Sequence, residues 1–185
     1  MTAPAPHPPP AGRLDEKAYL DRMVPWLSVL PGFLRRSVHN PALRYYGTGE
    51  SLHWPTQSNL NVFAALAVMA SSPVLPEQSI PLSRQEILET ALALLRYALA
   101  THLTGHAPAS DGRSWGHHWI SVLGLERMAH GLDAIRDHLT DEDRSAVRRV
   151  LISECDWRLD ACEVVAGLVG ADGKNKPESN IWNGG

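Results

Sequence analysis

Two stretches of the chain carry apolar residues in patterns typical of buried α-helices. Residues 58–72 are apolar on every side beyond Asn61, which predicts a helix surrounded by the core. Ser83 and Glu86 form a capping-box pattern that opens a second helix. Its apolar stripe follows helical spacing, with charged residues opposite: Leu88, Leu92, Leu95 and Leu99. We therefore expect a helix followed by its helical partner.

The same order recurs in the second half of the chain. Ser114 is placed to cap a third helix, whose expected core face is Val122, Leu125, Met128, Leu132, Ile135 and Leu139. The acidic run 140–143 starts a fourth helix, expected to carry Val147, Leu151, Cys155, Cys162 and Val169 and to end at GLVGADGKNKP. Its two cysteines would lie about 10 Å apart, too far for a disulfide.

No segment shows the alternation of a β-strand, so the predicted fold class is all-α. Two consecutive antiparallel αα-hairpins are the simplest arrangement, with an irregular helical bundle as the alternative. One or two shorter helices, interrupted by Pro25 and Pro31, are expected within residues 14–36. Residues 1–13 are expected to be a disordered Pro-rich tail, and residues 14–185 a single domain.

Composition and charge exclude some partners. The chain has 185 residues, of which 44% are hydrophobic and 20% charged, as in ordinary globular proteins. Lys and Arg (17) do not outnumber Asp and Glu (20), which argues against a general nucleic-acid binder. No apolar run approaches the roughly 20 residues that span a bilayer, and no secretory signal is visible. We expect neither nucleic acid nor a membrane as partner, with the cytoplasm as the default compartment.

Three short segments combine tryptophan with asparagine, glutamine or histidine at a predicted helix start. They are HWPTQSNLN, RSWGHHW and PESNIWN. The starts near positions 58, 115 and 180 are roughly 60 residues apart, about the length of a helical hairpin with its loops. If the hairpins stack side by side, the three starts lie on one rim. Unpaired N–H groups and helix dipoles would favour an anion there.

Such a rim would suit a polyhydroxylated ligand, since tryptophan packs on the apolar face of a sugar while amides and imidazoles bind hydroxyls. The dipoles would add a preference for a carboxylate or sulfate. The candidate binding residues are Trp54, Gln57, Asn59, Trp115, Trp119 and Trp182. The alternative for each segment is structural, because tryptophan near a helix end often fills the core and asparagine often caps.

At WGHHW and NKPESNIWNGG the sequence resembles the heparinase II/III-like and alginate-lyase-like polysaccharide lyases. The stretch YYGTGESLHWPTQSNLNVFAALAVMA fits the same kind of N-terminal domain, so the resemblance covers most of residues 40–185. It implies an (α/α) toroid built of several hairpins, frequently followed by a β-sandwich domain. The residues present would form about two hairpins of an incomplete toroid that continues beyond Gly185.

The resemblance also implies an activity, β-elimination on an acidic, uronate-containing polysaccharide or oligosaccharide. An amide or basic side chain neutralises the C5 carboxylate, a His or Tyr removes the C5 proton, and an acid assists the departing O4. Members often carry an Asn-His pair near this point, whereas Ile181 follows the asparagine here. The candidates are Asn180 or Asn183 at the carboxylate, His117 or His118 as base, and Tyr45 or Tyr46 as acid.

Two other functions stay open. Glu178 could be the general acid of a glycoside hydrolase on the same scaffold, with Asp111 as the nearby candidate for its second carboxylate. A helical carbohydrate-binding protein without catalysis is the third hypothesis. We expect no cofactor and no metal. His117 and His118 are adjacent, but neighbouring residues on a helix point about 100° apart, and no metal-binding spacing occurs.

Overall fold

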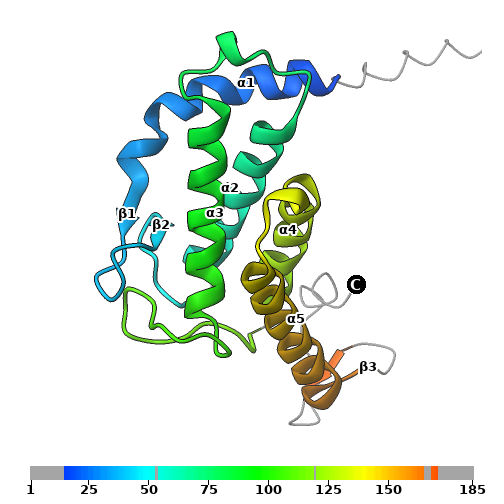
Figure 1. The fold of residues 1–185 in the computed structure, drawn as a ribbon. Helices are drawn as coiled ribbons and strands as arrows, with labels where there is room; N and C mark the ends of the chain where they lie inside the picture. The colour runs from blue at the N-terminus through cyan, green and yellow to red at the C-terminus, as the bar shows by residue number, and fades with distance from the viewer. Residues whose placement is uncertain (1–14, 53, 119, 165–167, 171–185) are drawn as a thin grey trace, which may run out of the picture.

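Two antiparallel helices, α2 (Trp54–Ser71) and α3 (Arg84–Thr101), form the centre of the fold. The computed structural model describes residues 15–52, 54–118, 120–164 and 168–170. They are mostly helical, which confirms the predicted helical class. Figure 1 shows α1 (Glu16–Val29) across one end of this pair and α4 (Ser121–Ala134) and α5 (Asp141–Ala161) beside it. None of the helices described is both long and apolar enough to cross a bilayer.

The central pair follows the sequence pattern closely. Side chains on several sides of α2 are fully buried, among them Leu60, Phe63, Leu66 and Met69. The predicted burial on every side is confirmed only in part, because Ala65 and Val68 are half-buried. It begins four residues earlier than predicted, with Pro55 in its first turn, where a missing N–H costs nothing. The capping box of α3 is formed, since Ser83 Oγ accepts from the Glu86 N–H at 3.2 Å and Glu86 Oε2 accepts from the Ser83 N–H at 2.8 Å.

Helix α4 packs closely on α2 through two glycines. A Cβ at Gly124 would lie 2.9 Å from Leu60 Cδ1, and one at Gly131 would lie 2.6 Å from Phe63 Cε1. The prediction that Ser114 caps this helix is wrong, because α4 begins at Ser121 and residues 114–118 are irregular. The helix also ends sooner than predicted, at Ala134, and a 3₁₀ turn, η3 (Arg136–His138), leads to α5.

The inward face of α5 differs from the predicted stripe. Asp143, Val150 and Glu154 are buried, whereas Leu151 and Cys155 are exposed. The sequence pattern assigns every charged residue to solvent, so it predicts the wrong buried face for this helix. Two of its carboxylates, those of Asp143 and Glu154, are buried. The helix also stops at Ala161, so the two cysteines do not share it. A short strand, β3 (Cys162–Val164), follows and pairs antiparallel with β4 (Leu168–Gly170).

A second small hairpin follows the first helix in the chain and packs against α2 and α3. Helix α1 continues through Pro25, contrary to the predicted interruption, and a 3₁₀ turn, η1 (Leu30–Phe33), leads into β1 (Leu34–Arg36). This strand pairs antiparallel with β2 (Arg44–Tyr46), Leu34 opposite Tyr46. Strands of three residues are too short to show alternation in the sequence, so the sequence pattern predicts neither hairpin.

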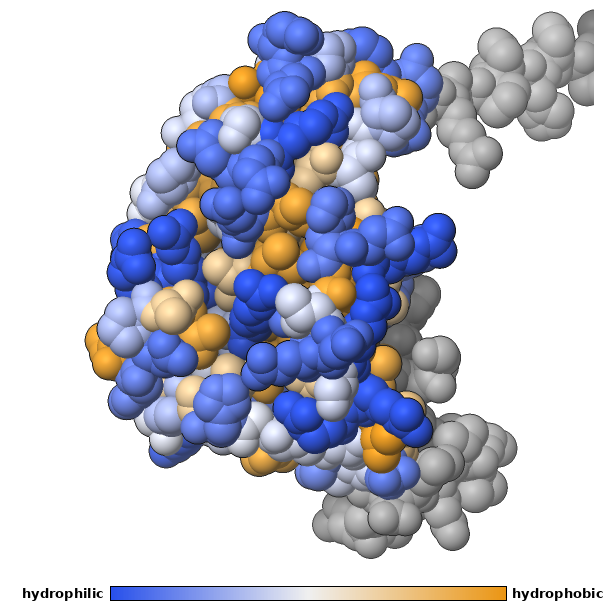
Figure 2. All heavy atoms as spheres, viewed as in Figure 1, coloured by the Kyte–Doolittle hydropathy of each residue, from blue (hydrophilic) through white to orange (hydrophobic). Residues whose placement is uncertain are grey.

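Hydrophilic residues cover most of the molecular face that is seen in Figure 2, with apolar residues near its centre.

The first turn of α5 is fixed by Asp143, whose side chain is only 5% exposed. Its carboxylate accepts from the Thr140 N–H at 3.1 Å and receives a two-pronged bond from Arg96 at 2.9 and 2.8 Å. Burial would raise the pKa of Asp143, but the hydrogen bonds from Arg96 and Thr140 outweigh it and hold the pKa below its ordinary 3.8. The carboxylate is therefore ionised throughout the neutral range.

Asp143→Ala is expected to lower the free energy of unfolding by about 2 kcal/mol at pH 7, through loss of the cap and of the Arg96 pair. A fully buried pair would cost more, but Arg96 is 43% exposed and solvent screens it. Because the folded-state pKa is lowered, this stabilisation is present above the unfolded value of 3.8 and is lost as pH falls below it. Urea unfolding at pH 7 and pH 3, with exposed Glu142→Ala as control, measures it. An equal difference at both pH values would contradict the assignment.

Candidate functional site

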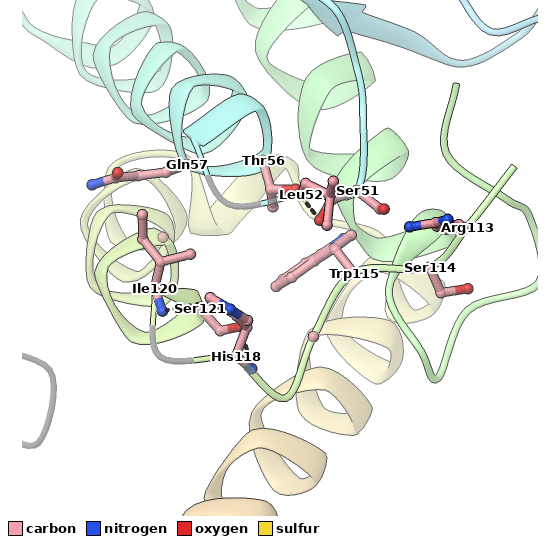
Figure 3. A pocket seen from close by; sticks show the side chains of 12 residues that line it. Ser51, Leu52, Thr56, Gln57, Arg113, Ser114, Trp115, His118, Ile120 and Ser121 are labelled. Carbon is pink, nitrogen blue, oxygen red and sulfur yellow. Dashed lines mark hydrogen bonds between the residues drawn. The ribbon is translucent and has the colours of Figure 1, made fainter. Parts of the chain in front are cut away.

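The starts of α2 and α4 lie side by side and enclose a cavity of about 130 Å³, which we call the rim cavity. Thr56 and Gln57 line it from α2, and Ser121 from α4. The loop 113–118 forms its remaining wall (Figure 3). Two of the three start segments singled out in the sequence therefore meet at one place. The third, residues 177–183, lies outside the described part of the chain.

Trp115 forms the wall of the rim cavity and also fills the core. Its indole Nε1 donates to the carbonyl of Ala98 at 2.8 Å, which satisfies a backbone acceptor near the end of α3. Its backbone pairs with the chain after α3, through the Thr101 carbonyl at 3.1 Å and the Leu103 N–H at 2.9 Å. The ring lies among the cavity-lining side chains in Figure 3. Both interpretations of this tryptophan, core filler and cavity wall, thus describe the same buried ring.

The backbone of residues 116–117 sends two adjacent histidines to different surfaces. Gly116 has φ 128°, and His117 has φ 52°, a left-handed conformation that costs a non-glycine residue about 1–2 kcal/mol. His118 lines the rim cavity. His117 instead stacks on Trp157 of α5, with ring centroids 5.5 Å apart and planes 4° apart, and its Nε2 lies 2.9 Å from Ser153 Oγ. Only one of the two candidate bases therefore borders the cavity.

A buried pair, His102 and Glu154, lies directly behind this bend. The side chains are 0% and 2% exposed, and His102 Nε2 lies 3.0 Å from Glu154 Oε1. The backbone N–H of Thr104 points at His102 Nδ1 from 3.1 Å, so Nδ1 must accept and Nε2 must carry the proton. The imidazole therefore donates to the carboxylate, and Glu154 Oε1 accepts a second bond, from the His117 backbone N–H at 2.6 Å.

These contacts determine the charge of Glu154. Burial would raise its pKa, but the hydrogen bonds from His102 and the His117 N–H outweigh burial and hold the pKa below its ordinary 4.5. The other oxygen, Oε2, is buried and has no hydrogen-bond partner among the described residues. Neither residue is among the candidates predicted from the sequence. The available signal for Glu154 was its position four residues after Val150, on the face that also carries Val147.

Several groups at the rim cavity could bind an anionic or hydroxylated ligand. Gln57 Oε1 is buried without a hydrogen-bond partner in the described structure. Arg113 is exposed and contributes a positive charge to the wall. The α4 N-cap residue, Ile120, makes no side-chain cap hydrogen bond, and the Ser121 N–H of the first turn donates to the His118 carbonyl at 3.0 Å. Two helix starts and a guanidinium at one cavity give it a positive potential.

The two loops bordering the rim cavity are tied to each other. Tyr97 in α3 donates to the Gly49 carbonyl and accepts from the Ser110 N–H at 3.1 Å. Burial raises the pKa of Tyr97 to about 12, so it remains a donor. Ser51 Oγ donates to Asp111 Oδ2 at 2.7 Å. Asp111, the candidate second carboxylate of a hydrolase, therefore joins these loops, which we call the paired loops (47–52 and 109–113).

The other candidates in the described structure lie away from the cavity. Asn59 is buried and ties β2 to α3, since its Oδ1 accepts from the Tyr46 N–H and its Nδ2 donates to the Leu94 carbonyl, both at 3.0 Å. Tyr45 packs on Tyr97 at a centroid distance of 4.9 Å. Tyr46 packs on Phe33 at 5.8 Å. The amide of Asn59 is thus occupied by backbone groups, and neither predicted acid lines the rim cavity.

Some sequence candidates remain outside these observations. Trp54 begins α2 and is 60% exposed, but it does not line the rim cavity. Trp119, Glu178, Asn180, Trp182 and Asn183 lie outside the described residues. Within the described residues no group of three or more His, Cys, Asp or Glu side chains is arranged to hold a metal ion.

Comparison with known proteins gives no match: no family model, no curated protein and no solved structure is significantly similar to this chain.

Proposed function

We propose that this chain is part of a polysaccharide lyase, and that it binds a uronate residue of an acidic polysaccharide at the rim cavity. One observation carries the proposal. Two segments that lie about 60 residues apart in the sequence, HWPTQSN and RSWGHH, both contribute residues to the wall of one cavity. Trp115, His118 and Arg113 are then close together, which combines an apolar ring, a titratable imidazole and a positive charge. The resemblance of the same segments to heparinase II/III-like lyases adds support.

The size of the rim cavity limits how it would be used. At about 130 Å³ it is smaller than the roughly 300–1,000 Å³ of pockets that enclose a whole ligand. The cavity would therefore hold one part of the polysaccharide, such as a single carboxylated sugar ring, while the neighbouring sugars lie outside it. Arg113 and the two helix starts would bind the carboxylate, because a guanidinium and the positive ends of helix dipoles both attract an anion.

The reaction assigns one role to His118. Its Nδ1 carries the lone pair, because that nitrogen accepts the Ile120 N–H at 3.4 Å. As this weak bond breaks, Nδ1 takes the C5 proton, which the neutralised carboxylate has made more acidic. The electron pair of the C5–H bond forms the C4=C5 double bond as the C4–O4 bond breaks, and O4 leaves with a proton from an acid. Neither Tyr45 nor Tyr46 lines the cavity, so we assign the acid to no described residue.

Turnover of uronate polymers tests the proposal. The 185-residue chain is incubated with polygalacturonate, alginate and hyaluronan, with dextran as a neutral control. We expect a rise in ultraviolet absorbance from the C4=C5 double bond on at least one acidic polymer and none on dextran. New reducing ends without that absorbance would indicate hydrolysis instead. Binding to an acidic polymer without cleavage would identify a non-catalytic carbohydrate-binding protein, and either result would overturn the lyase.

A further inference from the structure

One buried carboxylate, Glu154, ties the bend of the loop 115–118 to α5. On the other side of the bend, the His118 N–H donates to Ser121 Oγ at 3.2 Å. Glu154 Oε1 accepts the His117 N–H at 2.6 Å, shorter than an ordinary N–H···O bond, as expected when the acceptor is charged. This is the only described hydrogen bond that joins the backbone of residue 117 to α5. It lies at the residue whose φ of 52° turns the chain.

The surroundings of Glu154 are built for this approach. A Cβ at Gly116 would lie 2.7 Å from His102 Nε2 and 2.9 Å from Glu154 Oε1, so only glycine leaves room for the pair. His102 is itself fixed, by Thr104 on Nδ1 and by an edge-on contact with Trp115 at a centroid distance of 4.7 Å. Glu154 Oε2 stays buried without a partner among the described residues. A carboxylate that is only half satisfied is costly to bury and needs an explanation.

We propose that Glu154, oriented by His102, is a positioning residue: it holds the backbone of His117 in the left-handed bend that places His118 in the rim cavity. The proposal rests on the function proposed above, because it gives His118 a reaction to perform. Glu154 itself lines no part of the cavity and touches no substrate. It acts through His117, whose side chain faces α5 while the next side chain faces the ligand.

Because Trp115 is anchored independently of Glu154, loss of the Glu154 carboxylate should affect kcat more than KM. Trp115 is held by Ala98, Thr101 and Leu103, none of which depends on Glu154. Loss of the carboxylate would therefore leave the ring in the cavity wall and release only the bend that follows it. We expect Glu154→Ala, which removes the acceptor of the His117 N–H, to lower kcat about 10- to 100-fold, as for a misplaced catalytic group, with KM changed less than about threefold.

A nuclear magnetic resonance signature tests the contact independently of activity. In the 185-residue chain the amide proton of His117 is expected far downfield, because its partner is a charged oxygen at 2.6 Å. Glu154→Gln should move this proton upfield and shift the ring signals of His118. Glu142→Gln is the matched control, since it removes the same charge from an exposed position at the far end of the same helix. It should change neither signal.

The outcomes separate this proposal from the proposed function. An ordinary His117 shift in the wild-type chain, or one that Glu154→Gln leaves in place, overturns the positioning role even if that variant is poorly folded. A shifted amide with unchanged His118 signals, or unchanged kcat, also overturns it. If both signals depend on Glu154 but no uronate polymer is cleaved, the proposed lyase function is wrong, whereas the positioning of His118 by Glu154 is supported.

Discussion

Replacing His118 with alanine is expected to lower kcat/KM on a uronate polymer about 10²- to 10⁴-fold, the usual contribution of a positioned general base. The structure places this imidazole, and not its neighbour, beside Trp115 in the rim cavity. The loss should appear mainly in kcat, because the groups assigned to carboxylate binding, Arg113 and the helix starts, are unchanged. Initial rates of double-bond formation for both proteins at several substrate concentrations give the two constants.

His117→Asn provides the matched control for this experiment. Asparagine tolerates the left-handed conformation and retains the backbone N–H that Glu154 accepts, while the stack on Trp157 is lost. Because the His117 side chain faces away from the cavity, we expect a change of less than about threefold, typical of a surface substitution. The reverse ranking, with His117→Asn the more damaging change, would assign the base to His117, where it stacks on Trp157 of α5.

Gly131→Leu is expected to lower the free energy of unfolding by about 2–3 kcal/mol, as for a strongly overpacked core. A Cβ at this position would lie 2.6 Å from Phe63 Cε1 and 3.0 Å from Ala64 Cα, and the second of these is backbone that cannot turn aside. Leucine is the better helix former by nearly 1 kcal/mol, so any loss reports packing between α2 and α4. Urea unfolding followed by circular dichroism measures the change.

His130→Leu places the same side chain one residue earlier, on the exposed face of α4. It should leave stability within about 0.5 kcal/mol of wild type, as surface changes do. Since α2 and α4 together enclose the rim cavity, Gly131→Leu should also weaken binding of acidic oligosaccharides. A fully stable Gly131→Leu protein would mean that the two helices are not in close contact.

The central helices could be predicted because each local signal agreed with the tertiary structure. The run after Asn61 is apolar all round and most of its side chains are buried, and Ser83 with Glu86 forms the capping box that its spacing indicates. The apolar pattern predicts such helices well, because burial of each apolar residue on one face favours the same helix in the same orientation. The expected meeting of helix starts followed from the same regularity, since alternate helices in stacked hairpins point the same way.

The loop and the second half of α5 could not be predicted in this way. The pattern of α5 placed charges outside, yet Asp143 and Glu154 are buried because partners far along the chain, Arg96 and His102, satisfy them. Nor does local sequence reveal that His117 has a positive φ, because the carboxylate that holds the bend comes 37 residues later. Contacts of this kind are pairwise and long-range, so no periodicity records them.

The paired loops at the edge of the rim cavity can open only together, because hydrogen bonds join them to each other. Tyr97 binds Gly49 and Ser110, Ser51 binds Asp111, and Ser110 Oγ donates to the Thr48 carbonyl at 2.7 Å. Neither loop can leave the surface without breaking the bonds of the other. The paired loops, which contribute Ser51, Leu52 and Arg113 to the cavity, therefore form a single cooperative unit of local unfolding. Amide protons of both loops would report the same free energy of opening in hydrogen exchange.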